Sequence, residues 1–94
     1  MIVYVKQDLV PFVKTIQTDS AGTGILGMMG NKGGVAVRLR VHDSHFCFIN
    51  SHLAAGNEEL ERRNSDFKDI SKKLLFSEQN ANEDVTYSTI FDNE

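Results

Sequence analysis

Two polar side chains inside a glycine-rich run could bind an anion. Residues 30–38 begin with Asn31 and Lys32 between glycines and then turn into alternating apolar and polar residues. Small residues let the backbone approach a ligand closely, consecutive N–H groups can point into one concavity, and Lys32 adds a positive charge. The same residues are also ordinary β-turn chemistry. A plain turn and an anion-binding loop both remain open at this point.

A histidine directly follows the most apolar predicted strand. Residues 45–51 carry apolar side chains on both faces, which predicts a central strand buried on both sides, and His52 comes next. Imidazole titrates near neutral pH, and the ends of strands in α/β layers commonly hold sites. His52 is therefore a candidate catalytic residue. A histidine that is hydrogen-bonded for structure alone is the alternative.

Four large apolar side chains stand just before the candidate anion-binding loop. They are Ile25, Leu26, Met28 and Met29, in a stretch whose glycines exclude a stable helix. Loops normally lie on the surface. The four side chains either fold back into the core or form an exposed apolar tip that touches a partner or a membrane interface.

Periodicity predicts several strands around these candidates. Alternating or β-branched residues indicate strands at residues 2–6, 13–18 and 35–41, and a turn at residues 42–44 joins the last of these to the strand at residues 45–51.

One helix is expected over residues 57–76, with Asn57 as its N-cap. Its apolar stripe, which should face the core, consists of Leu60, Phe67, Ile70 and Leu74. Arg62 and Arg63 then belong to a solvated face. Residues 77–94 are polar and predict a surface loop or a disordered tail.

The bulk properties exclude several classes of protein. At 94 residues the chain is at most one domain, and its net charge of −3 gives no support for nucleic-acid binding. The single cysteine, Cys47, fits a reducing compartment and is expected to be a small buried hydrophobe rather than a nucleophile. No apolar run approaches the roughly 18 residues of a transmembrane helix.

Two blocks together resemble the inositol polyphosphate 5-phosphatases, and most of all the type II phosphoinositide enzymes. The first block runs from Gly22 to Arg38. The second is Asn-Ser-His-Leu-Ala-Ala-Gly at residues 50–56, followed by Glu-Arg-Arg-Asn-Ser-Asp-Phe-Lys-Asp-Ile at residues 61–70. The resemblance covers roughly residues 1–76, with both blocks in the order and spacing of that family.

The resemblance implies a fold and an activity. The fold is an α/β architecture, part of the DNase I-like (endonuclease/exonuclease/phosphatase) four-layer sandwich, here with mainly antiparallel strands and one long helix. The family removes the 5-phosphate from phosphoinositides such as PI(4,5)P2, and often from soluble inositol polyphosphates, with Mg²⁺. The implied partners are phosphoinositide head groups and the membrane surface, and the implied location is cytoplasmic, peripheral at the cytosolic face of membranes.

The resemblance also implies roles for individual residues. His52 matches the active-site histidine that contacts the scissile phosphate and stabilises charge as water attacks. Asn31 and Lys32 match the loop that binds the 1-phosphate of the lipid head group. The four apolar side chains at residues 25–29 match a neighbouring loop that touches the acyl chains.

Other family motifs are not found in these 94 residues. The metal-binding glutamate is expected upstream, a Trp-x-Gly-Asp-x-Asn-x-Arg motif just downstream, and the Pro-x-Trp-x-Asp-Arg and Ser-Asp-His motifs beyond it. Residues 1–76 are therefore expected to be the central part of an incomplete catalytic domain, with no metal ligands of its own and no activity alone. The alternative is a non-catalytic phosphoinositide-binding or regulatory module.

Three positions depart from the family pattern. Met28 stands where the loop is often basic, Gly56 where many type II members carry a second histidine, and Phe67 where a tyrosine is usual.

Overall fold

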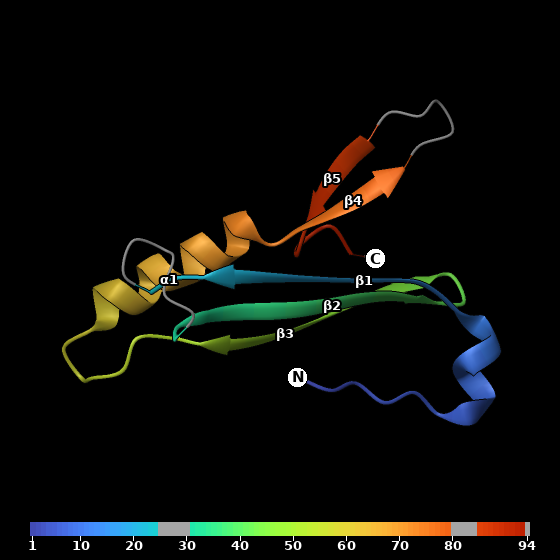
Figure 1. Ribbon diagram of the computed structural model, residues 1–94, viewed down its shortest axis with the longest axis horizontal. Coiled ribbons are helices and arrows are strands. Elements are labelled where there is room, and N and C mark those ends of the chain that lie inside the picture. Colours follow the sequence, from blue (N-terminus) through green and yellow to red (C-terminus); the bar gives the residue numbers. More distant parts are fainter. Residues whose placement is uncertain (25–30, 80–84, 94) are drawn as a thin grey trace.

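A three-stranded antiparallel sheet forms the body of the chain (Figure 1). The computed structural model describes residues 1–24, 31–79 and 85–93. The strands are β1 (Val13–Gly22), β2 (Gly33–Val41) and β3 (Ser44–His52). They pair in the order β1-β2-β3, so β2 is central. The strands predicted at residues 13–18, 35–41 and 45–51 are thus confirmed, each longer than expected.

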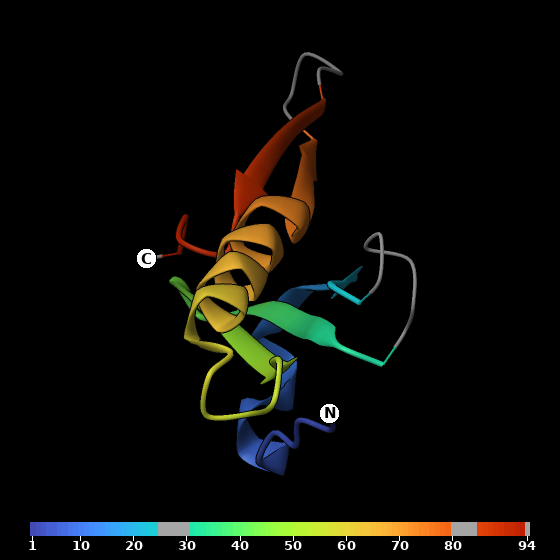
Figure 2. The same ribbon diagram turned by 90° about the vertical axis from the view of Figure 1, so that its left-hand side faces the viewer.

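The two faces of the sheet are covered differently. Helix α1 (Leu60–Lys73) and a second hairpin, β4 (Leu75–Gln79) with β5 (Val85–Thr89), follow the sheet in the chain. Figures 1 and 2 show α1 lying along one side of the sheet, while the N-terminal residues run along the other. A short 3₁₀ helix, η1 (Gln7–Phe12), connects these N-terminal residues to β1.

Small residues on β2 allow the helix to approach the sheet. Ala36 is buried, and a Cβ atom added at Gly34 would lie 2.9 Å from Cγ2 of Ile70, so this position has no room for a side chain unless Ile70 moves. The core that results lies between the sheet, α1 and β4. Its buried members are Ala21, Ala36, Ile70, Leu74 and Phe76.

The expectation that residues 45–51 form a central strand buried on both sides is wrong. In the described part of the chain β3 is one of the two edge strands of the sheet, because it pairs only with β2. Phe46 and Phe48 are each more than 40% exposed, and Ile49 is exposed as well. Apolar residues on both faces indicate that a strand could be buried, but not which neighbours cover it.

No strand forms at residues 2–6, where one was predicted. This segment is extended but has no regular structure, and Ile2 and Tyr4 are largely exposed. β-branched composition gives only a propensity. A strand also needs a neighbouring backbone for its hydrogen bonds, and among the described residues this segment has no ladder partner.

The helix is shorter than predicted, and it presents a different face to the sheet. It begins at Leu60, because residues 56–59 form a turn in which the N–H of Glu59 donates to the carbonyl of Gly56 at 3.3 Å, and the expected Asn57 cap does not form. Ile70 and Leu74 are buried as expected. Leu60 and Phe67 are exposed, so that half of the predicted apolar stripe points away from the described core.

A second hairpin occupies part of the range predicted as a polar loop or disordered tail. β4 and β5 pair from Leu75 with Thr89 to Gln79 with Val85. A carboxylate oxygen of Asp19 accepts a hydrogen bond from the N–H of Leu75 at 2.9 Å, which ties the start of β4 to β1. The composition of this range is polar, but Phe76 and Ser88 give the hairpin a buried side.

Candidate functional site

One end of the sheet gathers residues that lie far apart in the sequence. β1 and β3 end there and β2 begins there, at the left in Figure 1. In the strand register Gly33 is opposite both Gly22 and His52. Just beyond the strands, the N–H of Thr23 donates to the carbonyl of Lys32 at 2.9 Å. The pairing of β2 with β3 therefore brings Lys32 close to His52.

Three of the predicted site residues line the same cavity at this end. Asn31, Lys32 and His52 border a hollow of about 400 Å³, together with residues from the adjacent ends of β1, β2 and β3. A second hollow of about 340 Å³ shares Asn31 and Lys32 and adds Arg62 from α1. Within the described residues, the side chains of Asn31, Lys32 and His52 form no hydrogen bond or ion pair, so their polar atoms can take a ligand.

The narrow junction between β1 and β2 requires glycine at position 33. A Cβ atom added to Gly33 would overlap the carbonyl oxygen of Ala21 and come within 3.1 Å of the Gly22 Cα atom. A backbone atom cannot move aside as a flexible side chain can. Gly33 thus serves the close approach of β1 and β2, next to Lys32 at the rim of the cavity.

The segment that follows His52 is fixed to helix α1. We call residues 53–56 the post-strand loop. A carboxylate oxygen of Asp66, a residue only 4% exposed, accepts a hydrogen bond from the N–H of Ala54 at 2.9 Å. Arg63 donates to the carbonyl of Ala54 at 3.2 Å and to that of Gly56. Helix α1 therefore holds both backbone polar groups of Ala54.

The sequence analysis missed these two helix residues as parts of the site. Arg63 was expected on a solvated face, but it is half-buried against the post-strand loop, and only Arg62 is exposed. The missed signal is helical spacing: Arg63, Asp66, Ile70 and Leu74 recur three or four residues apart, on one face. A carboxylate in line with two buried apolar residues indicates a buried polar partner.

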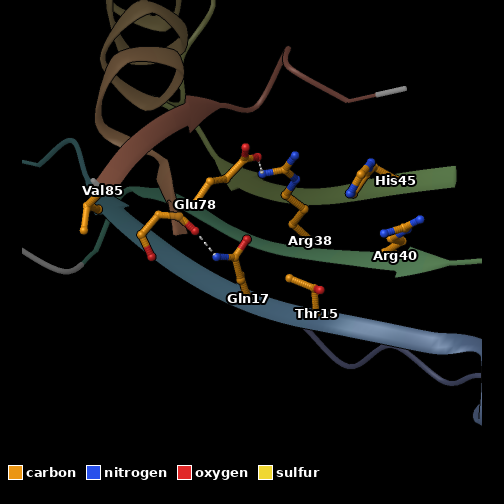
Figure 3. A pocket seen from close by; sticks show the side chains of 8 residues that line it. Thr15, Gln17, Arg38, Arg40, His45, Glu78 and Val85 are labelled. Carbon is orange, nitrogen blue, oxygen red and sulfur yellow. Dashed lines mark hydrogen bonds and ion pairs between the residues drawn. The ribbon is translucent and has the colours of Figure 1, made fainter. Parts of the chain in front are cut away.

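A larger cavity of about 760 Å³ lies between the sheet and the β4–β5 hairpin (Figure 3). Like the His52 end, it contains cationic side chains, but its two arginines, both on β2, are already paired. Arg38, only 5% exposed, donates to Glu78 at 2.7 Å and also to the Ser88 hydroxyl and the Asp92 carbonyl. Arg40 donates to Asp43 at 3.0 Å. The polar groups that line this cavity therefore connect the sheet to the hairpin by hydrogen bonds.

The pKa values of two groups near Arg38 depart from their ordinary values in opposite directions. The hydrogen bond from Arg38 lowers the pKa of the Glu78 carboxyl, although the group is largely exposed. Burial raises the pKa of the Cys47 thiol, and the positive charge of Arg38 only partly opposes this. A raised thiol pKa leaves less of the nucleophilic thiolate at neutral pH. This agrees with the expectation that Cys47 is not a nucleophile, although the side chain is half-buried and not buried as expected.

The predicted apolar loop cannot be located among the described residues. Ile25, Leu26, Met28 and Met29 lie outside the described residues, so the apolar loop stays a prediction. Within residues 1–24, 31–79 and 85–93, no three His, Cys, Asp or Glu side chains lie close enough to hold a metal ion. In the same part of the chain, no helix is both long and apolar enough to cross a membrane.

Comparison with known proteins decides the family. The profile of endonuclease/exonuclease/phosphatase family 2 matches residues 1–92, nearly the whole chain. The chain belongs to this family. The predicted fold class, part of a DNase I-like sandwich with antiparallel strands and one helix, is thereby confirmed.

The curated relatives of this family member are inositol phosphatases. The chain is 47% identical over 76 residues to the mouse type II inositol 1,4,5-trisphosphate 5-phosphatase, a match that covers 81% of the chain and 8% of the relative. It is 42% identical over 76 residues to human synaptojanin-2, covering 81% of the chain and 5% of the relative. The resemblance to the inositol polyphosphate 5-phosphatases is confirmed.

A solved structure shows the same architecture. The inositol polyphosphate 5-phosphatase domain of SpSynaptojanin, solved with inositol (1,4)-bisphosphate and calcium ion, superposes with a TM-score of 0.73 at 32% identity. The superposition covers 93% of this chain and 22% of that domain. The family member described here therefore spans less than a quarter of the domain that it matches.

Proposed function

We propose that this chain forms the phosphate-recognising part of a 5-phosphatase catalytic domain, which acts on phosphoinositides such as PI(4,5)P2 and on soluble inositol polyphosphates. One observation carries the proposal. The adjacent residues Asn31 and Lys32 line the same cavity as His52, which lies far from them in the sequence, at one end of the sheet. The names of the relatives support the reaction class, and the inositol bisphosphate bound to the SpSynaptojanin domain supports the ligand class.

Each of the three residues has a role that suits its chemistry. Lys32, with a positive charge, and Asn31, with an amide N–H, bind the phosphate that links the inositol ring to the lipid. His52 donates a hydrogen bond to the phosphate that is cleaved and stabilises the charge that develops as water attacks it. The glycine junction beneath them leaves the cavity open for a ring that carries several phosphates.

The proposal includes Mg²⁺, with its ligands in other parts of a complete domain. The described residues do not supply a set of ligands for a divalent cation. We therefore assign its ligands to other parts of a complete domain and derive no step through it. The isolated 94-residue chain is then inactive, because it lacks the acids that would hold the metal and orient the attacking water.

The membrane contact is a proposal on the same footing. The apolar side chains at positions 25, 26, 28 and 29 directly precede Asn31 in the chain. An apolar edge beside a head-group site suits a lipid substrate. We propose that the complete protein acts in the cytoplasm, at the cytosolic face of membranes.

A chimeric enzyme tests the function. Residues 1–76 of this chain would replace the equivalent segment of the mouse type II 5-phosphatase, which it matches over 76 residues. We expect this chimera to release phosphate from inositol 1,4,5-trisphosphate and from vesicles that contain PI(4,5)P2, when Mg²⁺ is present. A folded chimera without turnover, beside an active parent enzyme, would contradict the proposal.

The 94-residue chain by itself supplies the control. It should show no turnover under the same conditions, and turnover would contradict the assignment of the metal ligands to other segments. Binding of the chain to PI(4,5)P2 vesicles, combined with an inactive chimera, would instead favour the non-catalytic phosphoinositide-binding module.

A further inference from the structure

Helix α1 binds the post-strand loop through two side chains that have no role in the proposed function. Asp66 accepts the N–H of Ala54, and Arg63 donates to the carbonyl of the same residue. Ala54 lies two residues after His52. We infer that Asp66 and Arg63 are positioning residues, which fix the orientation of His52 toward the cavity through the backbone of the post-strand loop. This inference rests on the proposed function of His52.

The geometry limits what else could orient His52. His52 itself pairs with Gly33 of β2, and Ser51 before it pairs with Gly34. On its C-terminal side β3 ends, and the chain turns away without a ladder partner in the part that the structure describes. Leu53 packs partly against the core cluster. The hydrogen bonds to Ala54 are thus the first polar restraint after the strand.

Burial makes the Asp66 contact strong. A carboxylate that is 4% exposed needs hydrogen-bond donors, and the Ala54 N–H is itself buried. Removal of the carboxylate would leave this N–H without its partner, so the loop would shift to find another acceptor or water. A displacement of about 1 Å at a catalytic group can reduce the rate by as much as about 100-fold.

The two contacts act on the same residue in complementary ways. Asp66 restrains the N–H of Ala54, whereas Arg63 restrains its carbonyl and that of Gly56. The N–H and the carbonyl of Ala54 belong to the two peptide units that flank this residue, so neither unit can rotate about the chain direction without breaking a hydrogen bond. This arrangement fixes the path of the chain just after His52, and a single contact would not do so.

The test compares substitutions on α1 in the chimera. Asp66→Ala should lower kcat about 10–100-fold and leave KM within about twofold, because the substrate-binding residues stay in place. Asp66→Asn retains a carbonyl oxygen as acceptor, so kcat should stay within about threefold of the unmutated chimera. Asp69→Ala, which removes a carboxylate from the same helix but not from the post-strand loop, should leave kcat unchanged. An unchanged kcat in Asp66→Ala would overturn the inference.

Arg63→Ala keeps the test decisive if Asp66→Ala does not fold. This half-buried side chain should tolerate truncation, and its loss should also lower kcat at constant KM. The matched control is Lys68→Ala, which removes an exposed cation from the same helix. Equal kcat values for Arg63→Ala and Lys68→Ala would contradict a positioning role.

A second readout does not depend on activity. The imidazole carbon-bound protons of His52 give NMR signals that report the surroundings of the ring. These signals should shift or broaden in Asp66→Ala and Arg63→Ala, and stay in place in Asp69→Ala. If the unmutated chimera is inactive, the proposed function fails, while these signals still decide whether the helix positions His52. Unmoved signals in both Asp66→Ala and Arg63→Ala would overturn the inference.

Discussion

The two ends of the three-stranded sheet carry similar side chains in different states. At the end with β4 and β5, Arg38 and Arg40 are engaged by Glu78 and Asp43 from within the chain. At the other end Lys32 and His52 border an open cavity, and among the described residues neither side chain is paired. A cluster of positive charge therefore does not by itself identify a binding site. What distinguishes a site is charge that the fold leaves available.

Cavity size alone would select the end where the cationic side chains are already paired. The hollow beside Arg38 is the larger, at about 760 Å³ against about 400 Å³ beside His52. The groups in the larger hollow stabilise the fold, and those in the smaller one are free for an anion. Variants at the two ends should therefore separate into effects on stability and effects on turnover.

Arg38→Ala should have the largest effect on stability. It removes a buried guanidinium with charge-assisted hydrogen bonds to Glu78 and Ser88, and we expect the free energy of unfolding of the 94-residue chain to fall by about 2–3 kcal/mol. Urea unfolding followed by circular dichroism measures this. A loss of only roughly 0–1 kcal/mol, as for a surface ion pair, would show that the Arg38–Glu78 pair contributes no more than an exposed contact does.

Gly33→Ala should disturb the junction that supports the His52 end. The added methyl group overlaps the backbone of Ala21, so the free energy of unfolding of the chimera should fall by roughly 1–3 kcal/mol. Gly34→Ala is the matched control. Its methyl group meets only the side chain of Ile70, which can move, so its cost should be smaller. The reverse order would contradict the described packing of β1 against β2.

Lys32→Ala should act on substrate binding and not on stability. Loss of one charge-assisted contact to a phosphate should raise KM for PI(4,5)P2 about tenfold in the chimera, with kcat nearly unchanged. Inositol 4,5-bisphosphate, which lacks the 1-phosphate, serves as the comparison substrate. An equal rise in KM for both substrates would argue against a 1-phosphate role for Lys32.

The smallest predicted effect is a pH dependence of the free energy of unfolding, which arises from Glu78 beside Arg38. Arg38 lowers the pKa of Glu78 in the folded chain from its ordinary value of 4.5. The ionised form is therefore favoured by folding, and the stabilisation is present above pH 4.5 and lost as the pH falls through the lower, folded-state value. Unfolding measured from pH 6 down to pH 3 should show this loss, and Glu78→Gln should reduce it. Identical pH profiles would remove Glu78 as its source.

Local pattern predicted β1, β2 and β3 because each contains a run of alternating or strand-favouring residues, whereas the strand expected at residues 2–6 does not form. Residues 35–41 alternate cleanly and form most of β2. Strand neighbours were harder, since β3 is apolar on both faces yet lies at the sheet edge in the described chain. The hairpin after α1 was missed because its docking depends on contacts with β1 and β2 that are distant in sequence.

The site was predictable where its residues come from recognisable motifs. The Asn31-Lys32 loop and His52 were candidates from the sequence, and the strand register explains why they lie at the same end of the sheet. Arg63 and Asp66 were not identified, because their partners are backbone groups of the post-strand loop. A backbone partner leaves no trace in the identity of the residue that provides it. Only helical spacing next to Ile70 hinted at a buried role.

Two histidines on β3 allow the most direct test of the account. His52 borders the cavity of unpaired side chains at one end of the strand. His45 borders, at the other end, the cavity whose arginines are paired within the chain. We predict that His52→Ala lowers kcat of the chimera about 10²–10³-fold, as loss of a transition-state hydrogen-bond donor does, whereas His45→Ala leaves kcat within about twofold. An unchanged kcat in His52→Ala, or an equal loss in His45→Ala, would contradict the assignment of catalysis to the His52 end.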